Sequence, residues 1–285
     1  MNKTKQRGNG WSIKLALNLY KIFGYKFIYY LLYPITFVYT ILSTNLKSPL
    51  KNYYKHHNIK LTYKIFFNHL RFFAIALVDR FITRIDSKNY KFEFEDIDRQ
   101  LEIFSKATIL VLSHFGGWAA ASNSSQSKNQ MNVVMKEVIN SNIKEIENSL
   151  EIKTTLNVID LNKGQIATSI QIANALMRDE VVAIMGDRSF NDDGNISYMF
   201  LGEEAYFNKN PFKIAYKTDK PLVAYFIIFV GIQKYKVELI EINLDKTISE
   251  EEAIYKAIGE YVLKYEDVVK RYPNQWLNFY NFWEK

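Results

Sequence analysis

The sequence contains no cysteine, which excludes disulfides, a thiolate nucleophile and cysteine-based metal sites. Of its four histidines, the adjacent pair His56-His57 has no carboxylate nearby at ligand spacing, so we predict no metal site. After residue 60 there is no stretch rich in proline, glycine and serine, and no internal repeat. These absences favour one continuous folded body rather than modules joined by linkers.

Charge is missing altogether from residues 27–46. This length is sufficient for a helix to cross a bilayer, but Pro34 would kink the helix and its many tyrosines suit a membrane interface. We interpret the stretch as a membrane-associated helical hairpin or tilted anchor. A full span is the second choice, and the alternative to any membrane association is a buried amphipathic pair of helices in a soluble protein. A secretory signal peptide is disfavoured because no small-residue cleavage site follows.

The overall charge is basic. A net charge of +7 and a pI of about 9.1 indicate an anionic partner, either a lipid surface or a nucleic acid. Because the basic residues are dispersed and no nucleic-acid-binding motif is present, we predict a membrane surface and no nucleic acid. The aromatic content of 15% also suits a protein that meets a membrane interface.

Strand-like and helix-like segments alternate along the chain. Strands are predicted at 90–98, 109–112, 131–135, 156–160, 181–185, 221–231 and 234–242, and helices at 61–86, 96–104, 141–150, 164–178, 211–218 and 250–271. The alternation predicts an α/β fold, with a central, mostly parallel sheet flanked by helices and the last two strands as a hairpin. Residues 58–285 are expected to form this domain, with residues 1–50 as an appended, membrane-associated helical anchor.

A histidine follows the most apolar predicted strand, 109–112. His114 comes just before Gly116 and Gly117, which permit a tight turn, and a helix is expected to begin near Ala119. In open α/β sheets, ligands bind at the carboxyl edge of the strands. A histidine held there by one ring nitrogen is able to take a proton from a hydroxyl, and free glycine amides would bind an oxyanion. A packed histidine at a strand end is the alternative.

Two charged residues follow the apolar strand at 181–185. Parallel strands would bring Asp187 and Arg188 to the same edge as His114. Arg188 would hold a phosphate or carboxylate with two hydrogen bonds, and Asp187 would orient Arg188 or a substrate hydroxyl. A structural ion pair is the alternative. Phe200-Leu201-Gly202, by itself, is typical of an ordinary turn.

In this order, the segments resemble the bacterial lipid A late-acyltransferase family, within the lysophospholipid acyltransferase superfamily. The matching residues are His114-Phe115-Gly116-Gly117-Trp118, Gly186-Asp187-Arg188, Phe200-Leu201-Gly202 with Ala205, Pro211-Phe212 with Ile214-Ala215 ahead of residues 220–223, and residues 272–276, which are similar to a Pro-x-Gln-Trp signature. The aromatic residues 279–283 are similar to the branch found beside aryl-polyene pathways. With the N-terminal anchor, the resemblance covers nearly the whole chain.

The resemblance implies a glycerolipid-acyltransferase-like fold and transfer of an acyl chain from acyl carrier protein, or a similar thioester, to a hydroxyl of a membrane lipid, as in lipid A biosynthesis. It implies that His114 is the general base and that the thioester is the co-substrate, with no other cofactor. The protein is then expected at the inner (cytoplasmic) membrane, with the catalytic domain facing the cytoplasm. The implied substrate-binding residues are Gly116, Gly117, Trp118, Arg188, Phe200, Leu201 and Gly202.

The chain departs from the family pattern of His, four residues, then Asp or Glu. Ala119 occupies the acidic position, and residues 119–130 contain neither acid. Loss of the acidic partner of a catalytic histidine costs orders of magnitude in rate. Either Asp187 supplies the catalytic carboxylate, or Ser122 or a backbone carbonyl orients the ring. As a third possibility, the protein is an impaired homologue that binds lipid or acyl carrier protein without turnover.

Overall fold

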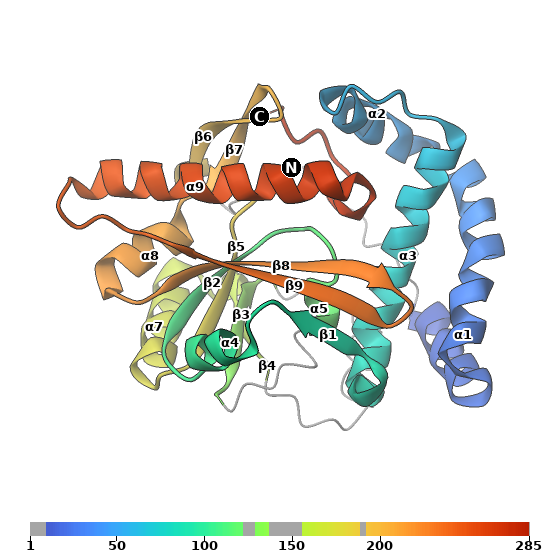
Figure 1. Ribbon diagram of the computed structural model, residues 1–285, viewed down its shortest axis with the longest axis horizontal. Coiled ribbons are helices and arrows are strands. Elements are labelled where there is room, and N and C mark those ends of the chain that lie inside the picture. Colours follow the sequence, from blue (N-terminus) through green and yellow to red (C-terminus); the bar gives the residue numbers. More distant parts are fainter. Residues whose placement is uncertain (1–9, 122–128, 137–155, 189–191, 285) are drawn as a thin grey trace.

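The computed structural model describes residues 10–121, 129–136, 156–188 and 192–284 (Figure 1). Its centre is a sheet of seven described strands, with a separate two-stranded ribbon beside it. The sheet strands are β1 (Lys91–Phe94), β2 (Thr108–Leu112), β3 (Met131–Met135), β4 (Leu156–Asp160), β5 (Val181–Met185), β8 (Leu222–Gly231) and β9 (Lys234–Ile242). The ribbon strands are β6 (Asn195–Phe200) and β7 (Glu203–Asn208).

The strand order is β1-β9-β8-β2-β5-β3-β4. Neighbouring strands are parallel except β8 and β9, which form the predicted antiparallel hairpin. The short strand β1 lies at one edge, as its alternating sequence predicts. The structure therefore confirms the predicted α/β class with a mostly parallel sheet, and it places β2 and β5 side by side in the middle.

Helices cover both faces of the sheet. The α-helices are α1 (Gly10–Leu42), α2 (Lys47–His56), α3 (Tyr63–Ile85), α4 (Ile97–Phe104), α5 (Trp118–Ala121), α7 (Gln165–Met177), α8 (Asn210–Thr218) and α9 (Glu250–Arg271), and the short 3₁₀ turns are Thr44–Leu46, Ser87–Asn89, Leu161–Lys163, Asp192–Gly194 and Pro273–Gln275. Figure 1 shows α9 across one face and α1 and α3 side by side at one end.

The described part of the protein has two buried hydrophobic clusters, one on each face of the sheet, and strand β2 contributes to both. All five residues of this strand are buried. Ile109 and Val111 join the cluster formed with α2, α7, α8 and α9, whereas Leu110 and Leu112 join the cluster formed with α1, α3, α4 and α5. Successive side chains of a strand point to opposite faces. A continuous apolar run is therefore required where helices cover both faces.

The N-terminal helices differ from the sequence prediction. No hairpin forms within residues 27–46, because α1 continues through Pro34 and is interrupted earlier, at Gly24, where φ is 76°. The chain turns only after Leu42. Most of the predicted connector 51–60 is helical, since α2 runs from Lys47 to His56. The predicted helix at 141–150 lies outside the described residues.

Among the described helices, none alone has the length and hydropathy that a membrane span requires. The segments Trp11–Leu42 and Thr44–His56 meet these criteria together, with a bend of 80° between them.

Candidate active site

The carboxyl ends of β2 and β5 define the site. The two strands are parallel neighbours, with Leu112 paired to Met185 in their register. The amide of Gly186 donates a 2.7 Å hydrogen bond to the carbonyl of Leu112. This bond holds together the segments that follow the two strands. As a result His114, which follows β2, and Asp187, which follows β5, leave the sheet at the same edge.

His114 and Asp187 are in direct contact. Nδ1 of the imidazole lies 2.9 Å from Oδ1 and 3.1 Å from Oδ2 of Asp187, and the backbone amide of His114 donates to Oδ2 at 2.8 Å. The carboxylate is fully buried, while the imidazole keeps 20% of its side-chain surface exposed. One carboxylate thus fixes both the backbone and the ring of His114.

Asp187 remains ionised in this buried position. Burial alone would raise its pKa, but the contact with His114, the charge of Arg188 and the Asn278 amide lower the pKa to about 2. Nδ2 of Asn278 donates to Oδ2 at 2.9 Å, and the hydroxyl of Tyr265 lies 3.5 Å from the same oxygen. These groups compensate for the loss of water around the carboxylate.

Arg188 contacts the opposite side of the imidazole, with Nη2 2.6 Å from Nε2. A guanidinium has donors and no acceptor. Nε2 therefore accepts, and the ring proton sits on Nδ1, where it is donated to Asp187. This is the tautomer that a histidine needs in order to take a proton at Nε2.

The glycines after His114 correct one prediction. Their amides are not free to bind an oxyanion, because Gly116 donates to the carbonyl of Gln275 at 2.9 Å and Gly117 donates to that of Ile227 at 2.8 Å. Gly116 has a φ of 63°, and a Cβ atom there would overlap the carbonyl oxygen of Ile227; one at Gly117 would overlap the ring of Tyr235. Glycine is required at both positions by close packing.

The segment after α9 completes the site. Trp276 pairs with Phe115 in an antiparallel bridge, and the amide of Leu277 donates to the carbonyl of His114 at 2.7 Å. The side chain of Gln275 makes two hydrogen bonds to the backbone of Phe229 in β8. The neighbouring Asn278 then reaches Asp187.

Sequence reasoning missed Asn278, Tyr265 and the structural role of Gln275. The motif at 272–276 pointed to this segment, but no local pattern distinguished an asparagine two residues beyond Trp276. Tyr265 had no signal beyond its place on the buried face of α9.

Phe200-Leu201-Gly202 forms the turn between β6 and β7. Leu201 and Gly202 have φ values of 52° and 85°, as in the tight turns that join two-stranded hairpins. The ring of Phe200 is buried and stacks 5.2 Å from that of Tyr265, which lies near Asp187. This triplet is thus connected to the His114 site through Tyr265, and its part in binding substrate stays a prediction.

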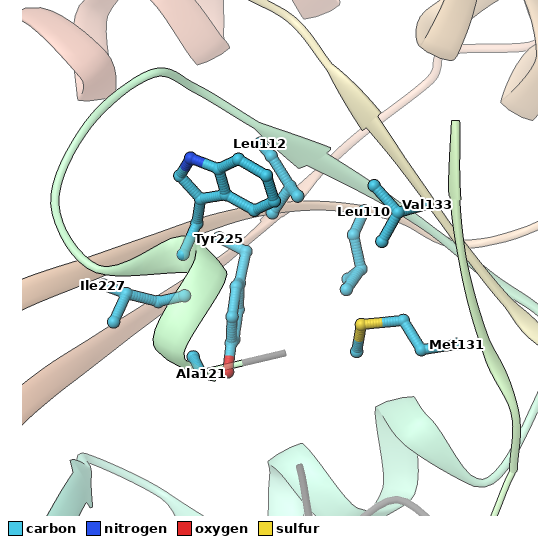
Figure 2. Close-up of a pocket in the computed structure, with 8 residues that line it drawn as sticks. Leu110, Leu112, Ala121, Met131, Val133, Tyr225 and Ile227 are labelled. Atoms are coloured by element: carbon cyan, nitrogen blue, oxygen red, sulfur yellow. The ribbon is translucent and has the colours of Figure 1, made fainter. Parts of the chain in front are cut away.

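Trp118 lies at the start of α5 and lines an apolar cavity on the face of the sheet that α1, α3, α4 and α5 cover. The remaining lining residues are Leu110, Leu112, Ala121, Met131, Val133, Tyr225 and Ile227 (Figure 2). The volume is about 10 Å³, room for about one water molecule. This void is too small for an acyl chain in the present conformation, and the role of Trp118 in binding substrate stays a prediction.

Ala119 occupies the first turn of α5, and Asp187 provides the carboxylate that contacts His114. A mostly parallel sheet, with a buried carboxylate held against an imidazole at its carboxyl edge, is typical of α/β enzymes. The model of the family described as bacterial lipid A biosynthesis acyltransferase matches residues 38–285, and the chain belongs to this family. The protein is therefore an acyltransferase, which confirms the resemblance inferred from the motifs.

A solved structure, the crystal structure of the 1-acyl-sn-glycerophosphate (LPA) acyltransferase PlsC from Thermotoga maritima, is similar at 14% sequence identity. The similarity covers 85% of this chain and 97% of that chain, with a TM-score of 0.40. No curated protein matches the sequence significantly.

Proposed function

We propose that the protein transfers an acyl chain from acyl carrier protein, or a similar thioester, to a hydroxyl of a membrane lipid, with His114 as the general base. The observation that carries this proposal is the position of the His114 ring. Nδ1 faces the ionised Asp187, and Nε2 is held as an acceptor by the exposed Arg188. A neutral imidazole in this state is able to deprotonate a hydroxyl at Nε2.

The proton and the acyl group move in a balanced sequence. Nε2 of His114 takes the proton from the acceptor hydroxyl as its oxygen attacks the thioester carbonyl, which forms a tetrahedral oxyanion. Asp187 stabilises the resulting imidazolium through Nδ1. Collapse of the intermediate breaks the carbon–sulfur bond, and the departing thiolate receives the proton from Nε2. The thioester is the only co-substrate in this scheme.

Arg188 takes the role that was expected of the glycine amides. The acceptor hydroxyl must replace its guanidinium at Nε2, which leaves a cation beside the reacting carbonyl. The Arg188 guanidinium lies 5.4 Å from the ring centre of Tyr280, and its long side chain is exposed. A cation at this position would stabilise the oxyanion or hold an anionic group of the substrate.

Membrane association is supported by the reversed polarity of the last part of α1. Phe37, Val38 and Ile41 are more than half exposed, whereas Thr36 and Thr40 are almost completely buried. In water, apolar side chains favour the interior and threonines favour the surface. An outward apolar face of this kind is suited to lipid, so we propose that α1 contacts the inner membrane, with the α/β domain on its cytoplasmic side.

A second candidate function follows from Ala119. An impaired homologue would bind lipid or acyl carrier protein without turnover, because the family acid is absent. The contact between Asp187 and His114 favours an active enzyme, since the carboxylate reaches the ring from β5 instead of α5.

The test is acyl transfer from acyl carrier protein to extracted membrane lipids, measured for the wild type and two variants. We expect His114→Ala and Asp187→Asn to lower the rate by about 10³-fold or more. The exposed Asp179→Asn is the control and should retain full activity. Undiminished transfer by His114→Ala would contradict the proposed base, and absence of turnover with retained lipid binding would favour the impaired homologue.

A further inference from the structure

A basic groove lies between α2 and the start of α3, and none of its lining residues is among those that contact His114. Its volume is about 1070 Å³, comparable to that of large ligand sites. The residues that line it are Lys47, Ser48, Lys51, Asn52, Lys55, Asn58, Ile59, Lys60, Leu61, Thr62, Tyr63 and Phe66. Four of these are lysines, and none is acidic.

The backbone gathers these lysines on one side. Lys47, Lys51 and Lys55 are four residues apart, so they share a face of α2. Asn58 adopts a left-handed conformation with a φ of 56°, which turns the chain back after the helix and brings Lys60 to the same groove. Lysines from two segments therefore line the same groove.

These ammonium groups have no carboxylate partner within the described part of the chain. Lys47 is the most enclosed and lies 4.9 Å from the centre of the Tyr63 ring. Lys51, Lys55 and Lys60 are exposed. Clustered cations without acidic partners repel one another, and an anion placed among them would relieve that repulsion.

The distribution of charge along the sequence points to the source of the anion. Residues 1–78 contain 12 lysines and arginines and no aspartate or glutamate, whereas the remainder contains 25 basic and 30 acidic residues. The excess of positive charge thus resides entirely in the part of the chain that also carries the exposed apolar face of α1. This combination suits an anionic lipid surface.

The bend after α1 joins the two features. Leu42, the last residue of α1, is 73% exposed, and the next helical segment, Thr44–His56, turns away by 80°. Lys47 is only five residues beyond Leu42. Residues suited to acyl chains and residues suited to anionic headgroups therefore follow one another directly in the chain.

We propose that the groove between α2 and α3 binds the phosphate headgroup of an anionic membrane phospholipid, and this inference rests on the membrane association in the proposed function. The lysines contact the phosphate as point charges, and the hydroxyl groups of Ser48 and Thr62 supply further donors. A lipid held here fixes the orientation of the α/β domain on the membrane surface.

The experiment measures binding of the full chain to sedimented vesicles of phosphatidylcholine, with and without phosphatidylglycerol. The double variant Lys51→Gln/Lys55→Gln is compared with Lys163→Gln/Lys213→Gln, an equal loss of charge at exposed lysines outside the groove. We expect the groove variant to bind the anionic vesicles roughly 30-fold more weakly, and the control pair to bind within about threefold of wild type.

Three outcomes would overturn the proposal. If both double variants bound the anionic vesicles equally weakly, overall positive charge would be sufficient for binding. Saturable binding of inorganic phosphate alone at the groove would identify a site for free anions. Loss of binding to acyl carrier protein, with vesicle binding unchanged, would assign the groove to an acidic protein.

The proposed function is tested separately with detergent-dispersed acceptor. There the groove variant should transfer acyl groups at the wild-type rate, whereas His114→Ala should bind anionic vesicles normally without transferring. The transfer assay therefore tests the proposed function, the vesicle assay tests the groove, and a negative result in one does not affect the other.

Discussion

Arg188 and His114 are joined by a hydrogen bond from Nη2 to Nε2 at 2.6 Å, on the side of the ring opposite Asp187. Both ring nitrogens therefore have a protein partner. Asp187 is a permanent partner because it is buried. Arg188 is exposed, so an incoming hydroxyl is able to displace it.

Removal of the guanidinium should have two opposite effects. In Arg188→Ala, Nε2 is open to solvent, so we expect diethyl pyrocarbonate to modify His114 about tenfold faster, given the 1.5–3 kcal/mol typical of a charged hydrogen bond. Acyl transfer should fall, because the cation beside the reacting carbonyl is lost. Peptide mass spectrometry gives the modification rate at this histidine, and Arg178→Ala is the exposed control. Equal rates in both variants would show that Arg188 does not occupy Nε2 in solution.

An acidic residue at position 119, where the family has Asp or Glu, should not raise the rate of acyl transfer. In Ala119→Glu the new carboxylate has no free ring nitrogen of His114 to contact, because Nδ1 is bound to Asp187 and Nε2 is bound to Arg188. We expect a transfer rate no higher than that of the wild type, measured with the same donor and acceptor. A rise of tenfold or more would mean that Asp187 supports His114 poorly.

The turn after His114 should tolerate no side chain. In Gly116→Ala the added Cβ would overlap the carbonyl of Ile227, in addition to the strain of a positive φ, and we expect a loss of more than about 3 kcal/mol in unfolding free energy. Gly202→Ala is the matched control, since its φ of 85° is also positive but its surroundings are open. Strain alone should cost about 1–2 kcal/mol there. Chemical denaturation measures both, and equal losses would contradict the close packing of Gly116.

A second buried carboxylate should make stability depend on pH. Asp79 in α3 accepts hydrogen bonds from Tyr25 at 2.6 Å, from Tyr90 at 2.8 Å and from Tyr235. Burial raises its pKa from 3.8 to about 6, although the three hydroxyls lower it in part. The folded state therefore binds this proton more tightly than the unfolded state between these two pH values.

For a carboxyl with a raised pKa, the stabilising contribution is complete below pH 3.8 and is lost as the pH rises through 6. Relative to Asp79→Asn, the wild type should thus lose on the order of 3 kcal/mol of unfolding free energy between pH 4 and 7. Denaturation curves across this range measure the difference, with Asp86→Asn as a control. A difference that does not change with pH would contradict the raised pKa.

Much of the fold was predictable from local patterns. The long helix at 250–271 begins after Ser249, whose side chain caps the amide of Glu252, and acidic residues fill its first turn. The apolar run at residues 109–112 of β2 indicated a sheet that is covered on both faces. The ribbon of β6 and β7 and the helix α2 were missed, because α2 is rich in lysine and tyrosine and becomes stable only by packing Leu50, Tyr53 and Tyr54 into the core.

The site was predictable in part for a similar reason. The parallel arrangement of β2 and β5 follows from alternation of strands and helices, so the proximity of His114 and Asp187 could be expected. The engagement of the glycine amides depends on Gln275 and Ile227, which are more than 100 residues away in the chain. The contact of Asn278 with Asp187 likewise depends on tertiary packing that no local pattern encodes.

The pairing of Trp276 with Phe115 and the hydrogen bond from Asn278 to Asp187 make the site depend on a segment that lies far along the chain from β2 and β5. Residues 276–278 are synthesised after both strands, so these contacts form only once a later part of the chain has folded back onto the site. The charge of Asp187 is fully sheltered only when that segment docks. The centre is thereby complete only when residues 276–278 have docked, and a variant that loosens this segment would leave it unfinished although β2 and β5 are intact.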